Sequence, residues 1–511
     1  MISKKLLLST LKKILPFFLI FSVAVFLRFY LLEELPGEMF GDVNENFKDI
    51  AEIMSGKLAI FFPKNTGREG MLFYLTAIIA RFLGLSYLTQ KITTALIGLA
   101  GVLAIYFLGK ELVDKKVGLL AAFFLAISRW HLTFSRLGLR AILMPLFVSL
   151  VFIFFLKSIR KLKLVDFLVT GLFLGLGMYT YTAFRVMPIL ILTGYFWAFW
   201  QKQRREKIFL LKGMAIVSLS FALVFAPLAI YAWKSPLSYW HHPARMINSQ
   251  GKTLSDLIKV LLTNLVNQAA MLHLRGDIVF RVNPPRAPQL DLLSGLFFLL
   301  GGVYLFGKRQ LWPFVLLPLI VLQLPSVLVL NFPIDIPSAT RSIGALPFVC
   351  LIVALGASWS FRKISERKPL LAKLMFAWLF LMALALNFKS YFFDYTRGLP
   401  NGNVPFGKII ASRIDQLPES AEVFVYSCCW GEWGQPEPEA IKFSLRSPKE
   451  INFLKEGSFY CRSRKGNYYF ALDPRGKDFL SQLELCFPGG IFKEVKSPEG
   501  KVIFWEYQNG F

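Results

Sequence analysis

The sequence contains no internal repeat and no low-complexity segment, and few charged residues interrupt its apolar runs. Membrane transporters are commonly built from repeated halves with broken helices, and they carry charged side chains near the middle of the membrane. The missing repeat and the scarcity of mid-span charge therefore argue against transport as the main activity.

A signal-peptide cleavage site is also missing. Four lysines precede the apolar run 14–27, as in a secretory signal, but Arg28 and Phe29 follow this run instead of a small-x-small motif. We therefore expect the run to remain in the protein as its first membrane span.

Cysteine is sparse, with five residues, and no CxxC pair is present. Cys350 lies in an apolar run and is interpreted as a packing residue. The other four are near the C-terminus: Cys428, Cys429, Cys461 and Cys486. One or two disulfides are expected there in an oxidising compartment, with the adjacent pair bonded to the later cysteines. Free cysteines are an alternative, and a metal site is less favoured without the CxxC spacing.

Hydrophobic residues, in contrast, are abundant. They make up 55% of the 511 residues, whereas soluble domains are about 45–50% apolar. We therefore predict a polytopic α-helical membrane protein. The net charge of +26 does not indicate a nucleic-acid partner, because the basic residues are concentrated in short loops between the apolar runs.

The apolar runs predict about eleven membrane-spanning helices, most of them near the ~20 residues that a straight span requires. The runs lie at residues 14–32, 91–109, 117–129, 142–157, 165–181, 184–200, 208–232, 291–307, 311–330, 342–360 and 370–387. A further apolar piece, 71–85, is interrupted by Arg81, and we expect it to lie at the membrane interface.

The positions of lysine and arginine predict the orientation of the chain. With the N-terminus in the cytoplasm, every short basic loop lies inside, as the positive-inside rule requires. The outer segments are then 33–90, 130–141, 182–183, 233–290, 331–341 and 388–511. We predict a transmembrane domain over 1–387 in the plasma or inner membrane, with its first extracytoplasmic loop at 33–90. An extracytoplasmic α/β domain over 388–511 is expected to follow.

Alternating and apolar stretches in the C-terminal segment predict its elements. Strands are expected at 423–426, 468–472, 492–495 and 502–507, and a helix at 476–485. The last two strands flank the turn sequence SPEG, which indicates a hairpin.

The outer segments also place charged and aromatic side chains beside the ends of the spans. The candidate acids are Asp42, Glu45 and Glu69, and the candidate substrate-binding residues are Arg68, Arg136, Arg140, Tyr181, Arg185, His273, Arg275 and Arg341. Arginine near a membrane face is costly unless it is paired or hydrated, and its planar fork binds phosphate through two bonds. A carboxylate beside such arginines can act as the base for a hydroxyl. The pattern favours group transfer from a phosphate-bearing lipid.

Each of these residues also has a plainer interpretation. Arginines at span ends frequently serve as interfacial anchors. Asp277, a further acid of the outer segment 233–290, would in the same way only cap a turn or pair with Arg275. Glu45 and Asp49 are four residues apart, so both would lie on one solvated face of a helix.

Several segments together resemble the GT-C glycosyltransferases, and more narrowly the bacterial branch similar to protein O-mannosyltransferases and aminoarabinose transferases. The segments are GDVNENF (41–47), GREGMLFYLTAIIARFLGLS (67–86), SRWHLTFSRLGLRAILMPLF (128–147), GLGMYTYTAFRVMPIL (175–190) and HLRGDIVFRVNPPRAPQLD (273–291). The resemblance covers about residues 10–360, and its motifs are specific together rather than singly.

This resemblance implies an enzyme that moves a sugar from a polyprenyl-phosphate carrier to an acceptor on the outer face of the membrane. Asp42 matches the family's first-loop aspartate, which is expected to deprotonate the acceptor hydroxyl, so that the lipid phosphate is displaced with inversion. Basic residues stabilise the leaving phosphate, and the candidates for this role are Arg68, Arg136, Arg140 and Arg341.

The implied partners are the lipid-linked sugar, membrane lipid, and an acceptor that is a protein, a lipid or a cell-envelope glycan. No metal or other cofactor is expected, because arginines alone can hold a monophosphate leaving group.

Two departures from the family pattern leave the base open. Val43 follows Asp42 where a second acid is usual, and Glu69 stands where proline is common, so Glu45 and Glu69 are alternative acids. Two other functions also stay open. One is a transporter or flippase for lipid-linked glycans, and the other is a non-catalytic assembly protein whose outer domain binds partners.

Overall fold

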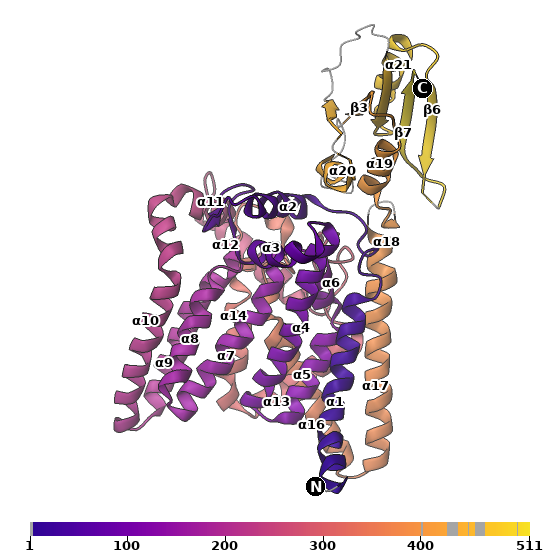
Figure 1. The fold of residues 1–511 in the computed structure, drawn as a ribbon. Helices are drawn as coiled ribbons and strands as arrows, with labels where there is room; N and C mark the ends of the chain where they lie inside the picture. Colours follow the sequence, from indigo (N-terminus) through magenta and orange to yellow (C-terminus); the bar gives the residue numbers. More distant parts are fainter. Residues whose placement is uncertain are drawn as a thin grey trace. The chain divides into compact units, whose positions relative to one another are not determined.

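A computed structural model describes residues 4–399, 402–426, 438–447, 449–454, 466–497 and 499–510 of the chain (Figure 1). These residues form two compact units. The first contains residues up to Leu32 together with Asp49–Tyr395, and the second contains Glu33–Lys48 together with the residues from Thr396 onward. The predicted boundary at 387/388 stays a prediction.

The first unit is a bundle of helices, and each of the eleven predicted apolar runs contains a helix. These helices are α1 (Lys4–Phe29), α4 (Tyr87–Leu112), α5 (Lys115–Ile127), α7 (Leu143–Lys161), α8 (Leu164–Gly177), α9 (Met187–Gln201), α10 (Arg204–Lys234), α13 (Leu292–Phe306), α14 (Trp312–Val321) with α15 (Leu324–Val327), α16 (Leu346–Ser365) and α17 (Pro369–Lys389). Among the described residues, seven helices are long and apolar enough to cross a membrane, or eight if one bent pair is a single span. The chain is thus a multi-span helical protein, and the count of eleven stays a prediction.

Small residues allow the central helices to approach closely. A Cβ atom added at Gly301 of α13 would lie 2.0 Å from the Ile352 carbonyl oxygen of α16, and one added at Gly356 of α16 would lie 2.0 Å from the Phe297 oxygen of α13. Close backbone contact of this kind is typical of packed membrane helices. It makes α16 the most buried of the long apolar helices, with α7 next.

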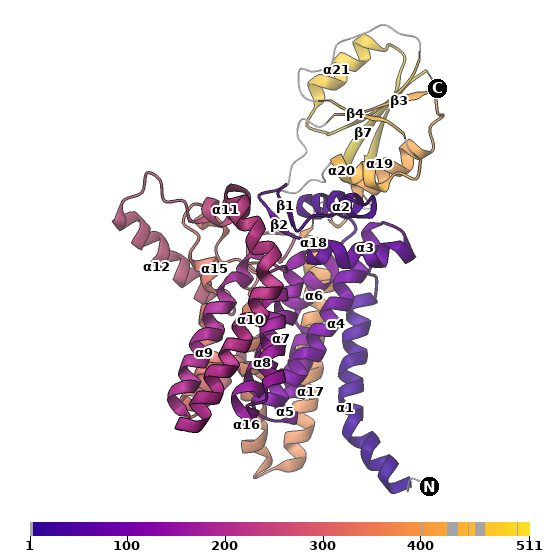
Figure 2. The same ribbon diagram turned by 60° about the vertical axis from the view of Figure 1, so that its left-hand side comes forward.

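Short elements gather at one end of this bundle. They are the strands β1 (Phe61–Phe62) and β2 (Arg68–Glu69) and the helices α3 (Met71–Leu83), α6 (Arg129–Leu137), α11 (Pro236–Ile247) and α12 (Leu254–Ala270). Figures 1 and 2 both show α3, α11 and α12 at this end. The helix α3 corresponds to the piece expected at the interface, and α6 follows α5 after a bend of 58°. The candidate polar residues of the first unit lie mainly in these elements and beside them.

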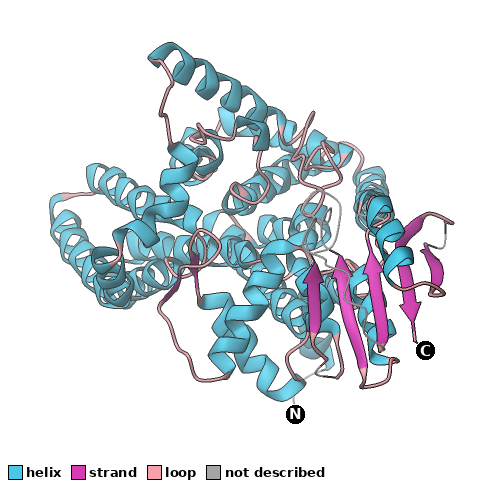
Figure 3. Ribbon diagram, turned by 90° about the horizontal axis from the view of Figure 1, so that it is seen from above, coloured by secondary structure: helices cyan, strands magenta, loops and turns pink. Residues whose placement is uncertain are grey.

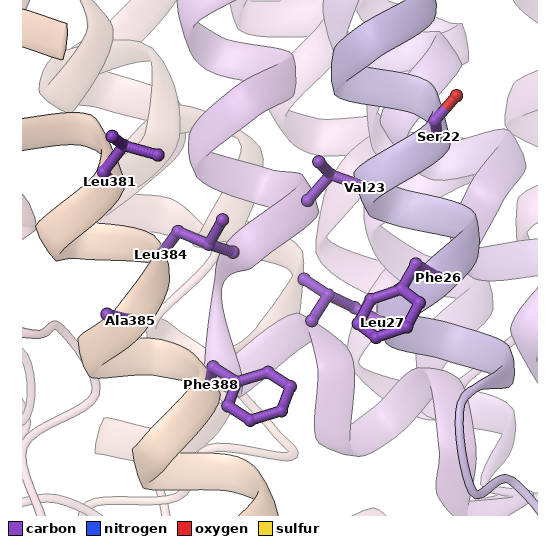
Figure 4. Close-up of a pocket in the computed structure, with 8 residues that line it drawn as sticks. All are labelled: Ser22, Val23, Phe26, Leu27, Leu381, Leu384, Ala385 and Phe388. Carbon is purple, nitrogen blue, oxygen red and sulfur yellow. The ribbon is translucent and has the colours of Figure 1, made fainter.

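Two peripheral helices leave an apolar groove between them. Figure 4 shows this groove, of about 500 Å³, between α1 and α17. It is lined by Ser22, Val23, Phe26, Leu27, Leu381, Leu384, Ala385 and Phe388. Such a lining offers no charged group to a phosphate, so the groove is not a candidate site for the polar end of a substrate.

The second unit contains a five-stranded sheet with strand order β4-β3-β5-β7-β6, whose strands are the larger magenta arrows of Figure 3. Its strands are β3 (Ala421–Tyr426), β4 (Ile451–Leu454), β5 (Asn467–Leu472), β6 (Ile491–Lys496) and β7 (Val502–Asn509). β3 pairs in parallel with β4 and β5, whereas β7 pairs antiparallel with β5 and β6. The helices of this unit include α19 (Phe406–Asp415), α20 (Pro438–Ser444) and α21 (Lys477–Cys486).

The predicted C-terminal elements are largely confirmed. All four predicted strands, the hairpin and the helix at 476–485 are present, and β4 is the described strand of this sheet that was not predicted. Cys486 is disulfide-bonded, and Cys350 is free and buried. The other three cysteines lie outside the described residues.

The segment 33–48 belongs to the second unit because its polar groups bond there. Glu38 accepts a hydrogen bond from the Gly407 amide at 2.6 Å, and the Gly37 amide donates to Asn403 at 2.8 Å. The helix α2 (Gly41–Met54) begins within this segment and continues into the first unit.

Candidate active site

A two-residue strand positions the central acid of the candidate site. β1 and β2 pair antiparallel, with Phe61 opposite Glu69 and Phe62 opposite Arg68. The turn between them requires Gly67, whose φ is +95° and whose added Cβ would lie 2.8 Å from the Phe61 ring. Successive side chains of a strand point to opposite faces, so Arg68 and Glu69 meet different partners.

Glu69 is the centre of a buried ion-pair cluster. Its carboxylate is 1% exposed, and its two oxygens each lie 3.1 Å from an arginine, Oε2 from Arg140 Nη1 and Oε1 from Arg185 Nη2. The Thr182 hydroxyl also donates to Oε1, at 2.9 Å. We call Glu69, Arg140, Thr182 and Arg185 the Glu69 cluster. Two guanidinium groups and one carboxylate give it a net charge of +1.

Aromatic rings restrain both arginines of the cluster. The guanidinium carbon of Arg185 lies 3.9 Å from the centre of the Tyr239 ring and 5.1 Å from that of Trp240, both on α11. The corresponding carbon of Arg140 lies 5.6 Å from the centre of the Tyr181 ring. Cation–π contacts and ion pairs thus hold the guanidinium planes. The arginine side chains remain 14% and 12% exposed, so a ligand can reach them.

Arg68 faces away from this cluster. It forms a buried ion pair with Asp49 of α2, its Nε donates to the Lys64 carbonyl at 3.2 Å, and its guanidinium lies 5.4 Å from the centre of the Phe73 ring. The expectation that Asp49 lies on a solvated helix face is wrong, because its side chain is only 1% exposed. Arg68 therefore joins β2 to α2.

Arg136 also bonds inward. Its Nη1 donates to the carbonyls of Leu27, Arg28 and Tyr30 at 2.8–3.1 Å, and its Nη2 donates to that of Leu31 at 2.8 Å. These carbonyls are at the end of α1, where backbone acceptors lack partners within the helix. The contacts identify Arg136 as a cap of α1.

Three more candidates come from the loops near α12 and α13. Arg341 Nη2 lies 3.7 Å from Asp335 and 3.4 Å from the Met246 sulfur of α11. The His273 ring makes a hydrogen bond of 3.2 Å to the Gly295 carbonyl, and Arg275 is exposed. Their described contacts are thus with residues outside the Glu69 cluster.

Asp277 joins two of these loops from a buried position. Its Oδ1 accepts the Val279 amide at 2.8 Å, and its Oδ2 accepts the Ala339 amide at 2.6 Å. Burial raises the pKa of Asp277 to about 6, against the opposing effect of these two donors. Asp277 thus fixes the backbone next to Arg341.

Asp42 and Glu45 lie in the part of α2 that belongs to the second unit. Asp42 is in the first turn of the helix and is half-buried. Glu45 is partly exposed, and its carboxylate lies 2.8 Å from the Lys48 ammonium group. In the parts of the chain that the structure describes, no three His, Cys, Asp or Glu side chains are grouped to hold a metal ion.

Three residues of the site were not among the predicted candidates: Thr182, Tyr239 and Trp240. Thr182 follows the candidate Tyr181 directly, whereas Tyr239 and Trp240 lie in the segment 233–290, for which no helix was predicted. The run SYWHH, 238–242, holds both rings and was the available signal.

Both the sequence and the fold of the chain resemble known proteins. Residues 70–231 match the family model of dolichyl-phosphate-mannose-protein mannosyltransferase, and this range includes the whole Glu69 cluster except Glu69 itself. No curated protein sequence matches the chain.

Several solved structures share the fold. The archaeal oligosaccharyltransferase AglB from Archaeoglobus fulgidus, in complex with an inhibitory peptide and a dolichol-phosphate, is 15% identical with a TM-score of 0.54, over 98% of this chain and 74% of that one. ArnT from Cupriavidus metallidurans, bound to undecaprenyl phosphate, is 12% identical with a TM-score of 0.55, and the match covers 96% of this chain and 97% of ArnT. The arabinofuranosyltransferase AftD from Mycobacteria is 14% identical with a TM-score of 0.51, and the match covers 96% of this chain and 40% of AftD.

At these identities the similarity defines the fold, and the family match agrees with it. The matched family and the structures named above are glycosyltransferases. The predicted resemblance is therefore confirmed: this chain has the fold of the GT-C membrane glycosyltransferases.

Proposed function

We propose that the protein transfers a sugar from a polyprenyl-phosphate carrier to a hydroxyl-bearing acceptor on the outer face of the membrane. The observation that carries this proposal is the Glu69 cluster, in which Arg140 and Arg185 converge on one buried carboxylate. The GT-C fold and the undecaprenyl phosphate bound by ArnT support the class of donor.

The cluster is suited to a leaving phosphate. Negative charge grows on the phosphate oxygens as the bond to the sugar breaks, and donors fixed in advance stabilise that charge most effectively. Arg140 and Arg185 are fixed by Glu69 and by aromatic rings, so little reorganisation is needed when a phosphate binds. Each guanidinium still has N–H groups beyond the one that bonds to Glu69.

Asp42 is the proposed general base. In the reaction its carboxylate takes the proton of the acceptor hydroxyl, whose oxygen then attacks the anomeric carbon of the sugar. The bond between that carbon and the phosphate oxygen breaks, and the polyprenyl phosphate leaves with the bonding electrons. The products are the glycosylated acceptor, the lipid phosphate and a protonated Asp42.

The contacts also change the roles given to other candidates. Both oxygens of Glu69 accept bonds from Arg140, Arg185 or Thr182, so Glu69 is proposed as a positioning residue. Arg68 and Arg136 are proposed as structural residues, because their guanidinium groups are fully buried against Asp49 and the end of α1.

The first experiment measures sugar transfer by the purified full chain from a panel of polyprenyl-phosphate sugars, with membrane extract as the acceptor. Asp42→Asn is compared with Glu52→Gln, which changes a partly exposed acid of the same helix that pairs with Lys64. We expect Asp42→Asn to lose transfer while it remains monodisperse, and Glu52→Gln to keep it.

Each result has a defined consequence. Full transfer by Asp42→Asn would reject Asp42 as the base and leave Glu45 as the next acid to test. No transfer by the unsubstituted chain from any donor would favour the transporter instead. Broken helices are common in transporters, and α5 and α6 form such a bent pair in the part of the chain that the structure describes.

A further inference from the structure

The helix α12 has an unusual distribution of polar and apolar residues. It lies in the segment 233–290, which was predicted as an outer segment between two spans, and it starts at a capping box formed by Thr253 and Asp256. A helix that packs on a soluble protein normally buries its apolar side and exposes its polar side. In α12 the buried residues are Asn264 and Gln268.

These two side chains attach α12 to the helical bundle. Asn264 Nδ2 donates to the carbonyls of Val327 at 3.0 Å and Val329 at 2.6 Å. Gln268 Nε2 donates to the Ser342 hydroxyl at 2.9 Å and to Gln323 Oε1 at 3.2 Å. Buried polar groups with such partners fix the rotational orientation of the helix about its axis.

The exposed surface of α12 is divided into an apolar strip and a polar strip. The apolar strip consists of Leu254, Ile258, Leu262, Leu265 and Val266, all exposed, with Leu262 at 58%. The polar strip consists of Asp256, Lys259 and Thr263, also exposed. Each strip follows steps of three or four residues, so the two run side by side along the helix. This arrangement suits a helix with lipid on one side and water on the other.

The partners of Asn264 show the level of α12 along the bundle. Val327 is the last residue of the apolar helix Arg309–Val327, which is long enough to cross a membrane. A helix bonded to the end of a span lies where the hydrocarbon meets the lipid headgroups. Lys259 can extend from the border of the polar strip to the headgroups.

We propose that α12 is a lipid-contacting helix that lies in the membrane interface, with its apolar strip among the acyl chains and its polar strip toward water. The partner is the bilayer itself. This inference is independent of the proposed enzyme activity, because it depends only on the strips, on the inward polar contacts and on the attachment to the end of a span.

The test compares neighbouring positions in the full chain, reconstituted in phosphatidylcholine vesicles. Leu262→Cys and Thr263→Cys lie about 100° apart around the helix, and each carries a nitroxide label. Leu265→Cys and Lys259→Cys repeat the comparison. The signal of the native cysteines is recorded on the unsubstituted chain and subtracted.

Collision with oxygen reports lipid, and collision with a water-soluble nickel chelate reports water. We expect the oxygen-to-nickel collision ratio to be higher at 262 and 265 than in water, and close to the value in water at 263 and 259. Labels that meet the nickel chelate equally at all four positions would overturn the proposal, because α12 would then lie in water. Labels at 262 and 265 that meet neither reagent would also overturn it, because protein would then cover the strip.

Discussion

Arg136 Nη1 donates a hydrogen bond of 3.1 Å to the backbone carbonyl of Arg28. Arg28 in turn donates to the carbonyl of Ala126, near the end of α5, also at 3.1 Å, and its Nη2 lies 2.7 Å from His131 Nδ1. An arginine of α1 thus caps α5, and an arginine of α6 caps α1. These contacts give the bend between α5 and α6 a structural role, and they leave neither guanidinium positioned to carry a substrate.

The first prediction concerns Arg136. Arg136→Lys keeps the charge but loses the planar fork that reaches four carbonyls, so we expect a loss of stability on the order of 3 kcal/mol. Thermal unfolding in detergent measures it, with Arg367→Ala, an exposed position, as the control. Equal stability of Arg136→Lys and the unsubstituted chain would contradict the capping role.

The second prediction separates two roles for Glu69. Glu69→Gln keeps the size of the side chain but replaces one acceptor with a donor that cannot bond to a guanidinium. We expect the KM for the lipid donor to rise about tenfold, or about 1.4 kcal/mol of binding, with a smaller change in kcat. Steady-state kinetics over a range of pH provides the measurement. A lower kcat at unchanged KM, with one limb of the pH profile missing, would instead indicate a base.

The third prediction concerns Arg185. Arg185→Lys retains a positive charge but cannot stack on Tyr239 while it bonds to both Glu69 and a phosphate. We expect the KM for the donor to rise nearly as much as in Arg185→Ala. Arg81→Lys, at an exposed position of α3, is the matched control and is expected to bind the donor normally. A KM for the donor in Arg185→Lys equal to that of the unsubstituted chain would contradict this, because the positive charge alone would then be sufficient.

The fourth prediction is a pH dependence from Asp277. Burial raises its pKa from the ordinary value of 3.8 to about 6, so the folded state holds a proton that the unfolded state has already lost in that range. The contribution to stability is present below pH 3.8 and is lost as the pH rises through about 6.

Unfolding of the unsubstituted chain and of Asp277→Asn at a series of pH values tests this. The asparagine side chain does not titrate. The stability of the unsubstituted chain relative to Asp277→Asn should therefore fall between pH 4 and 7, by an amount on the order of 2–3 kcal/mol. A difference that does not vary with pH would show that Asp277 titrates normally.

The sequence predicted the helices well because apolar runs of membrane length have few other structures available. It also predicted the outer sheet from alternation within short strands such as 468–472. The predictions were poorest where a segment is neither fully apolar nor alternating. The helix α12 was missed for this reason, because its polar residues lie inside and its apolar residues outside.

The roles of the arginines could not be read from the sequence. Arg136 and Arg140 are four residues apart in one polar segment, yet one bonds to the carbonyls at the end of α1 and the other to Glu69. The difference arises from contacts with residues 71 to 109 positions away along the chain. A local pattern shows that a guanidinium needs a partner, but it does not identify that partner.

The hairpin of β1 and β2 has one more consequence. Its two strands are only two residues long, so backbone bonds alone specify their alignment weakly. A slip of one residue would turn Arg68 toward Arg140 and Arg185 and would turn Glu69 toward Asp49. Three cations would then meet on one side and two carboxylates on the other. Like charges therefore exclude the shifted pairing, and charge selects the register of this very short hairpin.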